Sequence, residues 1–172
     1  MTCRKASLQT YGVDGENRAM ALTSEQLASG ILLAYTLFNE GRYKDTETLV
    51  EGLLVLNPDN AYLHSLLAST CHLQNKPDQA IREYTRAIEL FPENISALVN
   101  RGELYLKQGM FAEAAKDLTR AAELDPKREN VSANRARLLM NMTSGALKLA
   151  SEKGVDAVHE AQRLIEKQLK QS

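Results

Sequence analysis

The helical pattern of apolar residues is doubled near the start of the chain, in residues 31–40, ILLAYTLFNE. A surface helix of a globular protein normally carries one apolar stripe and leaves its opposite side polar. At about 100° per residue, Leu33, Ala34 and Leu37 fall on one side of this helix. A second apolar group falls on roughly the other side, and it consists of Ile31, Leu32, Tyr35 and Phe38. One face can pack into a core, so the second face requires a separate explanation.

Turn signals recur along the chain with a fixed period. Pro58, Pro92 and Pro126 are each 34 residues apart and lie in the phrases VLNPDN, LFPEN and ELDPKR. Gly41 and Gly109 keep the same phase, two periods apart. Each proline falls where a helix must stop, because its ring excludes a further helical turn, and glycine supplies the left-handed turn between two helices. The spacing predicts helix hairpins that must stack, since a single hairpin cannot bury its own apolar face.

This pattern resembles the tetratricopeptide repeat (TPR), in which two helices and a turn occupy about 34 residues. The copy ISALVNRGELYLKQGMFAEAAKDLTRAAELDP matches best, with Gly102 and Tyr105 in its first helix and Gly109 at its turn. The resemblance covers residues 27–128. It implies an all-α fold, a right-handed superhelical stack of three TPR helix hairpins with an N-terminal arm and C-terminal capping helices.

The expected organisation has three parts, which are an arm (1–22), three repeats (23–128, at about 23–60, 61–94 and 95–128) and C-terminal capping helices (129–172). Thr23 and Gln26 fit a capping box, which predicts a helix start near residue 24. After the repeats, one helix is expected over about 131–153 and a final amphipathic helix over 155–170, with Gly154 between them.

The resemblance also explains the second apolar face of residues 31–40. In a tetratricopeptide array the first helix of each repeat lines the concave surface, so this face is expected to form the wall of a groove. The predicted peptide-binding groove comprises Ile31, Leu32, Tyr35, Phe38, Tyr62, Leu66, Ser69, Leu73, Val99 and Asn100. An exposed apolar patch of this kind marks a binding surface, here for a protein or peptide partner with apolar anchors. Alternatively, residues 1–22 or a second subunit cover the same face.

The side chains at these positions distinguish two kinds of tetratricopeptide protein. One grips acidic C-terminal tails of heat-shock chaperones with a clamp of Lys, Arg and Asn, but the corresponding positions here hold Ile31, Tyr35, Leu66, Ser96 and Asn100. Without a cation to pair a terminal carboxylate, this clamp is rejected. The layout instead resembles the class II chaperones of bacterial type III secretion, which bind translocator proteins. The segment ILLAYTLFNEGRYKDTETLVEGLLVLNPDNA resembles the first repeat of that group.

The function implied by the resemblance is a protein–protein interaction module. It would bind an apolar segment of a partner in the concave groove, as a cytosolic secretion chaperone for translocator-type proteins does. The alternative is a TPR assembly scaffold or adaptor within a multiprotein complex, without chaperone activity. A homodimer would suit the chaperone resemblance, but the sequence does not establish one.

Charge and targeting signals narrow the classes of partner. The net charge of the 172 residues is -1, which does not favour nucleic-acid binding or adhesion to an anionic membrane. The first twenty residues lack the apolar centre of a signal peptide, and no apolar run approaches the roughly 18 residues of a membrane span. Two cysteines provide no disulfide framework. We therefore expect a cytoplasmic protein without direct membrane insertion.

The sequence offers no catalytic constellation. It contains neither a phosphate-binding Gly-rich loop nor a His-Glu-x-x-His motif. His64, Cys71 and His72 lie close in sequence, but a zinc site needs three or four ligands and no further one is placed nearby. We expect structural roles for these three residues. The chain is accordingly predicted to be no enzyme and to need no cofactor or metal.

Overall fold

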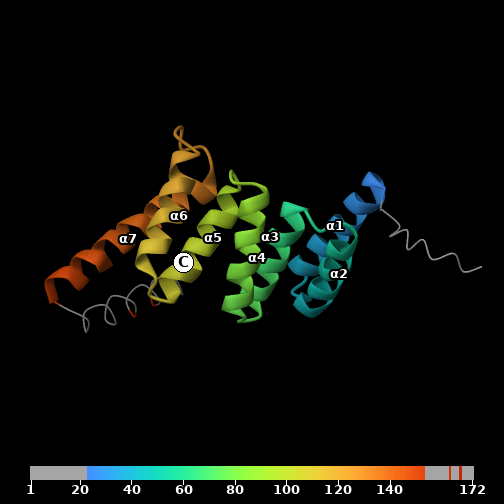
Figure 1. Cartoon of the computed structure of the whole chain (residues 1–172), viewed down its shortest axis with the longest axis horizontal. Helices are drawn as coiled ribbons and strands as arrows, with labels where there is room; N and C mark the ends of the chain where they lie inside the picture. Colours follow the sequence, from blue (N-terminus) through green and yellow to red (C-terminus); the bar gives the residue numbers. More distant parts are fainter. Residues whose placement is uncertain (1–22, 154–162, 164–166, 168–172) are drawn as a thin grey trace, which may run out of the picture.

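The computed structural model describes residues 23–153 together with the isolated positions 163 and 167, and this part of the chain contains helices and no strand. The helices are α1 (Ser24–Asn39), α2 (Tyr43–Leu56), α3 (Ala61–Leu73), α4 (Pro77–Leu90), α5 (Ile95–Lys107), α6 (Phe111–Glu123) and α7 (Val131–Lys153). Figure 1 shows them following one another along the long axis of the molecule, with α1 towards one end and α7 towards the other. The predicted all-α stack of hairpins is confirmed.

Left-handed residues make the tight turn inside each hairpin. Gly41 and Gly109 both have φ +75°, and Asn75 takes the equivalent place in the middle hairpin with φ +59°. At the first turn, the Gly41 and Arg42 amides donate to carbonyls of the preceding helix, as in a Schellman-type cap. Asparagine is one of the few other residues that enter this region at modest cost. The 34-residue phase of the turns therefore survives the replacement of glycine in the second repeat.

Side-chain caps determine where α1, α3, α5 and α7 begin. The capping box predicted at Thr23 is confirmed, because Gln26 N–H donates to the Thr23 hydroxyl and Thr23 N–H donates to the Gln26 side chain. Asn60, Asn94 and Asn130 each accept backbone N–H groups at the starts of α3, α5 and α7. These bonds satisfy amides that have no partner inside the helix.

Small residues at the 34-residue period let the helices approach closely. Ala34, Ala68, Gly102 and Ala136 are spaced by 34 residues and are all buried. A Cβ atom on Gly102 would lie 3.0 Å from the Leu118 side chain, so α5 and α6 pack closely at this point. Ala136 lies in α7, which therefore occupies the place of the first helix of a fourth repeat. The core runs through all of the hairpins to Leu139 of this helix.

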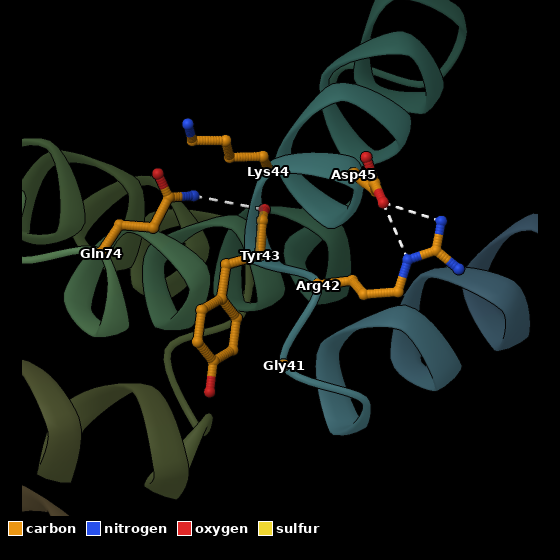
Figure 2. A pocket seen from close by; sticks show the side chains of 6 residues that line it. All are labelled: Gly41, Arg42, Tyr43, Lys44, Asp45 and Gln74. Atoms are coloured by element: carbon orange, nitrogen blue, oxygen red, sulfur yellow. Dashed lines mark hydrogen bonds and ion pairs between the residues drawn. The ribbon is translucent and has the colours of Figure 1, made fainter.

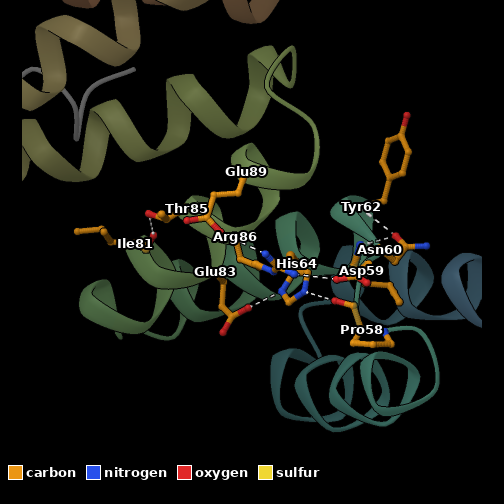
Figure 3. Close-up of polar contacts among 11 residues, drawn as sticks. Pro58, Asp59, Asn60, Tyr62, His64, Ile81, Glu83, Thr85, Arg86 and Glu89 are labelled. Carbon is orange, nitrogen blue, oxygen red and sulfur yellow. Dashed lines mark hydrogen bonds and ion pairs between the residues drawn. The ribbon is translucent and has the colours of Figure 1, made fainter.

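Polar contacts hold the two helices of a repeat together. The Arg101 guanidinium donates two bonds to the Asp117 carboxylate, at 2.7 and 2.8 Å, and holds α5 against α6. Figure 3 shows a second set, in which the ring nitrogens of His64 lie 2.8 Å from the Glu83 carboxylate and 2.8 Å from the Pro58 carbonyl. This set ties the loop before α3 to α4, which gives His64 the structural role expected of it.

The predicted N-terminal arm (1–22) lies outside the described residues, as does the predicted final helix (155–170) apart from positions 163 and 167. None of the described helices is both long enough and apolar enough to span a membrane.

Candidate peptide-binding face

Side chains of α1, α3, α5 and α7 meet in succession, and we call the surface that they form the inner face. Tyr35 of α1 and Tyr62 of α3 lie close enough to interact electrostatically. Lys107 of α5 reaches His72 of α3 at 3.1 Å. The Ser96 and Ser132 hydroxyls join α5 to α7 at 3.4 Å. The inner face is the surface that the sequence predicted to be concave.

One half of the inner face exposes large apolar side chains. The exposed fractions are 70% for Leu32, 41% for Tyr35, 61% for Tyr62 and 53% for Leu73. Partial burial raises the pKa of Tyr35, and the neighbouring Tyr62 raises it further. In Figure 3 the Tyr62 ring points away from His64 on the same helix, so α3 carries its exposed tyrosine and its hydrogen-bonded histidine on different faces. These four residues from α1 and α3 form a patch that we call the apolar patch.

Two predicted groove residues are only partly exposed. Ile31 and Phe38 are half-buried and pack against the core of the first hairpins. The Phe38 ring meets the Tyr43 ring edge-on, with 5.7 Å between the centroids. Both residues therefore present only part of their side chains to a ligand.

The prediction is wrong for Leu66 and Val99, which do not line an open groove. They are only 3% and 1% exposed and belong to the two core clusters. The cluster that contains Val99 also contains Ala136 and Leu139 of α7. Their positions within the repeat predict that both side chains face the concave surface. The packing of adjacent repeats covers them instead, and the sequence of one repeat does not specify that packing.

Ser69 and Asn100 hold a buried tyrosine. The Ser69 and Tyr84 hydroxyls lie 2.9 Å apart, and Asn100 is hydrogen-bonded to the same tyrosine. Burial raises the pKa of Tyr84 to about 12, although these two hydrogen bonds act in the opposite direction. Both side chains are half-buried. Their predicted role of holding a peptide backbone therefore competes with an internal one.

The other half of the inner face carries an ionic cluster, which we define as His72, Glu103, Lys107 and Arg135. The buried Glu103 carboxylate accepts from Lys107 at 3.1 Å and forms an ion pair with Arg135 of α7. Burial lowers the pKa of His72, and the Lys107 ammonium lowers it further. His72 Nε2 must accept from Lys107, because an ammonium group can only donate. Sequence reasoning missed this cluster, although the spacing of Glu103 and Lys107 at i and i+4 was a signal for part of it.

A cavity joins the two halves of the inner face. It has a volume of about 410 Å³, and its lining includes Leu73 of the apolar patch and both His72 and Lys107 of the ionic cluster. A ligand that contacts Leu73 thus lies next to a cationic group.

Two other cavities are less suited to binding an apolar segment. Figure 2 shows one of about 580 Å³ at the α1–α2 turn. Its polar groups bind one another, since Arg42 pairs with Asp45 and the Gln74 amide donates to the Tyr43 carbonyl at 3.2 Å. The other, of about 680 Å³, adjoins α4, α5 and α6 and includes the Arg101–Asp117 ion pair. The apolar patch is therefore a better candidate site than either of these two cavities.

The histidine and cysteine side chains do not converge on a metal site. In the part of the chain that the structure describes, no group of three or more His, Cys, Asp or Glu side chains is arranged to hold a metal ion. His64 and His72 bind different partners. Cys71 is buried, and burial raises the pKa of its thiol to about 11. A thiol of this kind behaves as a small core hydrophobe.

Comparison with protein families identifies the repeat. A family model described as tetratricopeptide repeat matches residues 31–94 and residues 74–129. The two matches together run from residue 31 to residue 129, more than half of the chain. The DnaJ homolog subfamily C member 3 of Gallus gallus is 32% identical over 96 residues, which is 54% of this chain and 19% of the relative. The chain thus spans about a fifth of the length of the curated relatives it matches.

Solved structures share the fold at low identity. The type III secretion translocator chaperone SycD of Yersinia enterocolitica aligns with a TM-score of 0.70 and 20% identity, over 74% of this chain and 89% of that chain. SycD in complex with a peptide of the translocator YopD gives a TM-score of 0.65 and 22% identity, over 76% of this chain and 98% of that chain. The likeness to these chaperones expected from the sequence is confirmed at the level of the fold.

Proposed function

Because the chain belongs to the tetratricopeptide repeat family, we propose that its inner face binds an apolar segment of a protein partner. The observation that carries this proposal is the apolar patch, in which four large side chains from two helices stay exposed. Covering such side chains releases about 25 cal/mol per Å² of apolar surface. The chain acts as a non-enzymatic interaction module, and the segment adopts an extended or helical form with anchors several residues apart.

The specific role we propose is that of a cytoplasmic chaperone for a secreted, translocator-type partner. This is supported by the shared fold with SycD, which has been captured with a translocator peptide. By holding the partner's apolar segment, the chaperone would keep that segment from aggregating before export. The alternative scaffold role would place the main contact on the outer face, near the exposed Val55 and Phe91, or on the C-terminal helix.

A pull-down with matched variants tests the binding face. The wild type is compared with a Tyr35→Ala/Tyr62→Ala variant and with a Val55→Ala/Phe91→Ala control, in extracts of cells that produce the protein. We expect the inner-face variant to lose its dominant partner, because it loses both aromatic anchors, while the control retains it. Circular dichroism checks that all three proteins are equally helical. Loss of the partner from the control alone would favour the scaffold role.

A further inference from the structure

The first repeat leaves apolar positions open that the second repeat covers. Leu33 of α1 is 52% exposed, whereas Leu67, the residue 34 positions further along the chain, is 3% exposed. Leu37 is half-buried, and its counterpart Cys71 is fully buried. Because Leu33 and Leu67 are the same residue type, the difference in exposure comes from their places in the stack.

The third repeat shows which helix covers this position. Arg101 is the counterpart of Leu33, and Asp117 is the counterpart of Leu49. The Arg101 guanidinium donates to Asp117 of its own hairpin and, at 2.9 Å, to the Thr85 hydroxyl of α4. The position therefore lies between the second helix of its own repeat and the second helix of the repeat before it. In the described part of the chain no repeat precedes α1, so one side of Leu33 is open.

A cavity along α2 continues this open side. It has a volume of about 490 Å³, and its lining includes Thr48, Leu49, Gly52 and Leu56. In the third repeat, the counterparts of the first three line a cavity of about 680 Å³ whose lining also includes Ile88 of the preceding helix α4. The first repeat thus supplies one wall of such a junction and lacks the other. We define the end face as Leu33, Leu37, Leu49 and Leu56.

Residues 1–22 are placed to cover the end face. They join the described structure at Thr23, where α1 begins. Leu33 and Leu37 lie about 15 and 21 Å along that helix. A segment that returns along α1 needs about seven extended or fourteen helical residues to reach Leu37, and 22 residues are present.

The sequence next to Thr23 also has suitable side chains. Met20 and Leu22 are apolar and lie closest to the start of α1 in the sequence. The end of α2 lies near the same point, because Leu53 packs against Gly30. Met20 and Leu22 are therefore within reach of the end face from its first residues onwards.

We propose that residues 1–22 bind back on the end face and take the place that the second helix of a preceding repeat would occupy. Terminal repeats need a covered apolar surface for the stack to stay soluble. Leu33 and Leu37 lie on roughly the other side of α1 from Leu32 and Tyr35, so this binding leaves the inner face open to a partner. The proposal does not depend on which partner binds there.

Photo-crosslinking in the purified full chain tests this proposal. The photoreactive residue p-benzoylphenylalanine is placed at Leu33 on the end face or at Tyr62 on the inner face, and mass spectrometry identifies the linked residues. A mixture of unlabelled and isotopically labelled protein distinguishes a link within one chain from a link between two copies. We expect position 33 to link to residues 1–22 of the same chain, and position 62 to give no such link.

Matched substitutions test whether the apolar side chains make the contact. Met20→Asp/Leu22→Asp should reduce the link from position 33 by at least about threefold, because it would bury charges against an apolar face. Ser7→Asp/Gln9→Asp adds the same charge to the segment without removing an apolar side chain, and it should leave the link unchanged. Thermal unfolding checks that both variants remain folded.

The outcomes separate this inference from the proposed function. A link from position 33 to a second copy would overturn the inference and make the end face a dimer interface. A link from position 62 to residues 1–22 would overturn it and would also count against the proposed function, because the segment would then lie on the inner face. Absence of any link to residues 1–22, or an undiminished link in Met20→Asp/Leu22→Asp, would overturn the inference and leave the proposed function standing.

Discussion

A single histidine of the ionic cluster, His72, lies beside Leu73 of the apolar patch. His72 of α3 faces Lys107 and Glu103 of α5 and Arg135 of α7, and burial and Lys107 together hold its pKa below 6.5. In the unfolded chain the same ring takes up a proton near pH 6.5. As the pH falls below 6.5, the unfolded state therefore binds a proton that the folded state resists, and the free energy of unfolding decreases.

The pH dependence of stability tests this assignment. We expect wild-type protein to lose unfolding free energy between pH 7.5 and pH 5.5, and His72→Gln to lose less, because its amide oxygen still accepts from Lys107 without titrating. Urea denaturation at both pH values measures the difference. An identical pH-dependent loss in the variant would contradict the assignment.

At the scale of elements, α7 acts as the first helix of a further repeat. Its Ala136 continues the 34-residue series of small residues, and its Leu139 joins the core cluster of α5 and α6. Arg137 also donates to the Ala122 carbonyl and to the Asp125 carboxylate, which holds α7 to the loop before it. The helix therefore belongs to the folded unit and completes one end of the inner face.

Neighbouring leucines of α7 provide a matched test. Leu139 is buried and Leu138 is exposed. We expect Leu139→Ala to lower the free energy of unfolding by about 2–4 kcal/mol, because it opens a cavity in the core. Leu138→Ala should change it by about 0.5 kcal/mol or less. Equal effects in urea denaturation would mean that α7 does not pack on α5 and α6 as described.

The elements themselves could be predicted from the sequence, because local signals specify them. Gly41, Gly109 and the repeated prolines mark turns whatever the neighbouring repeats are. Ala136, the fourth member of the small-residue series, also keeps the 34-residue spacing in the sequence. What could not be predicted was the burial of Leu66 and Val99, because adjacent repeats cover them.

The candidate site, too, could be predicted from the sequence only in part. The exposed face of residues 31–40 and the contribution of Tyr62 follow from helical periodicity combined with the repeat. The ionic cluster draws residues from α3, α5 and α7, which are separated by as many as 63 positions between His72 and Arg135. No periodicity within one repeat specifies such a contact, and it depends on how neighbouring repeats pack.

At the scale of the whole molecule, the stacked hairpins place unlike surfaces in a row. Because each repeat contacts mainly its neighbours, the inner face can change from apolar to ionic along the stack without disturbing the fold. The central claim is that this segment lies on the inner face, against α1 and α3.

Site-specific photo-crosslinking tests that claim most directly. The photoreactive residue p-benzoylphenylalanine is placed at Tyr62 on the inner face or, as a control, at the exposed Phe91 after α4. The account expects position 62 to crosslink to a partner protein in cells that produce the chain, and position 91 to give none of that product. A partner crosslinked from position 91 alone, or a second copy of this chain crosslinked from position 62, would contradict it.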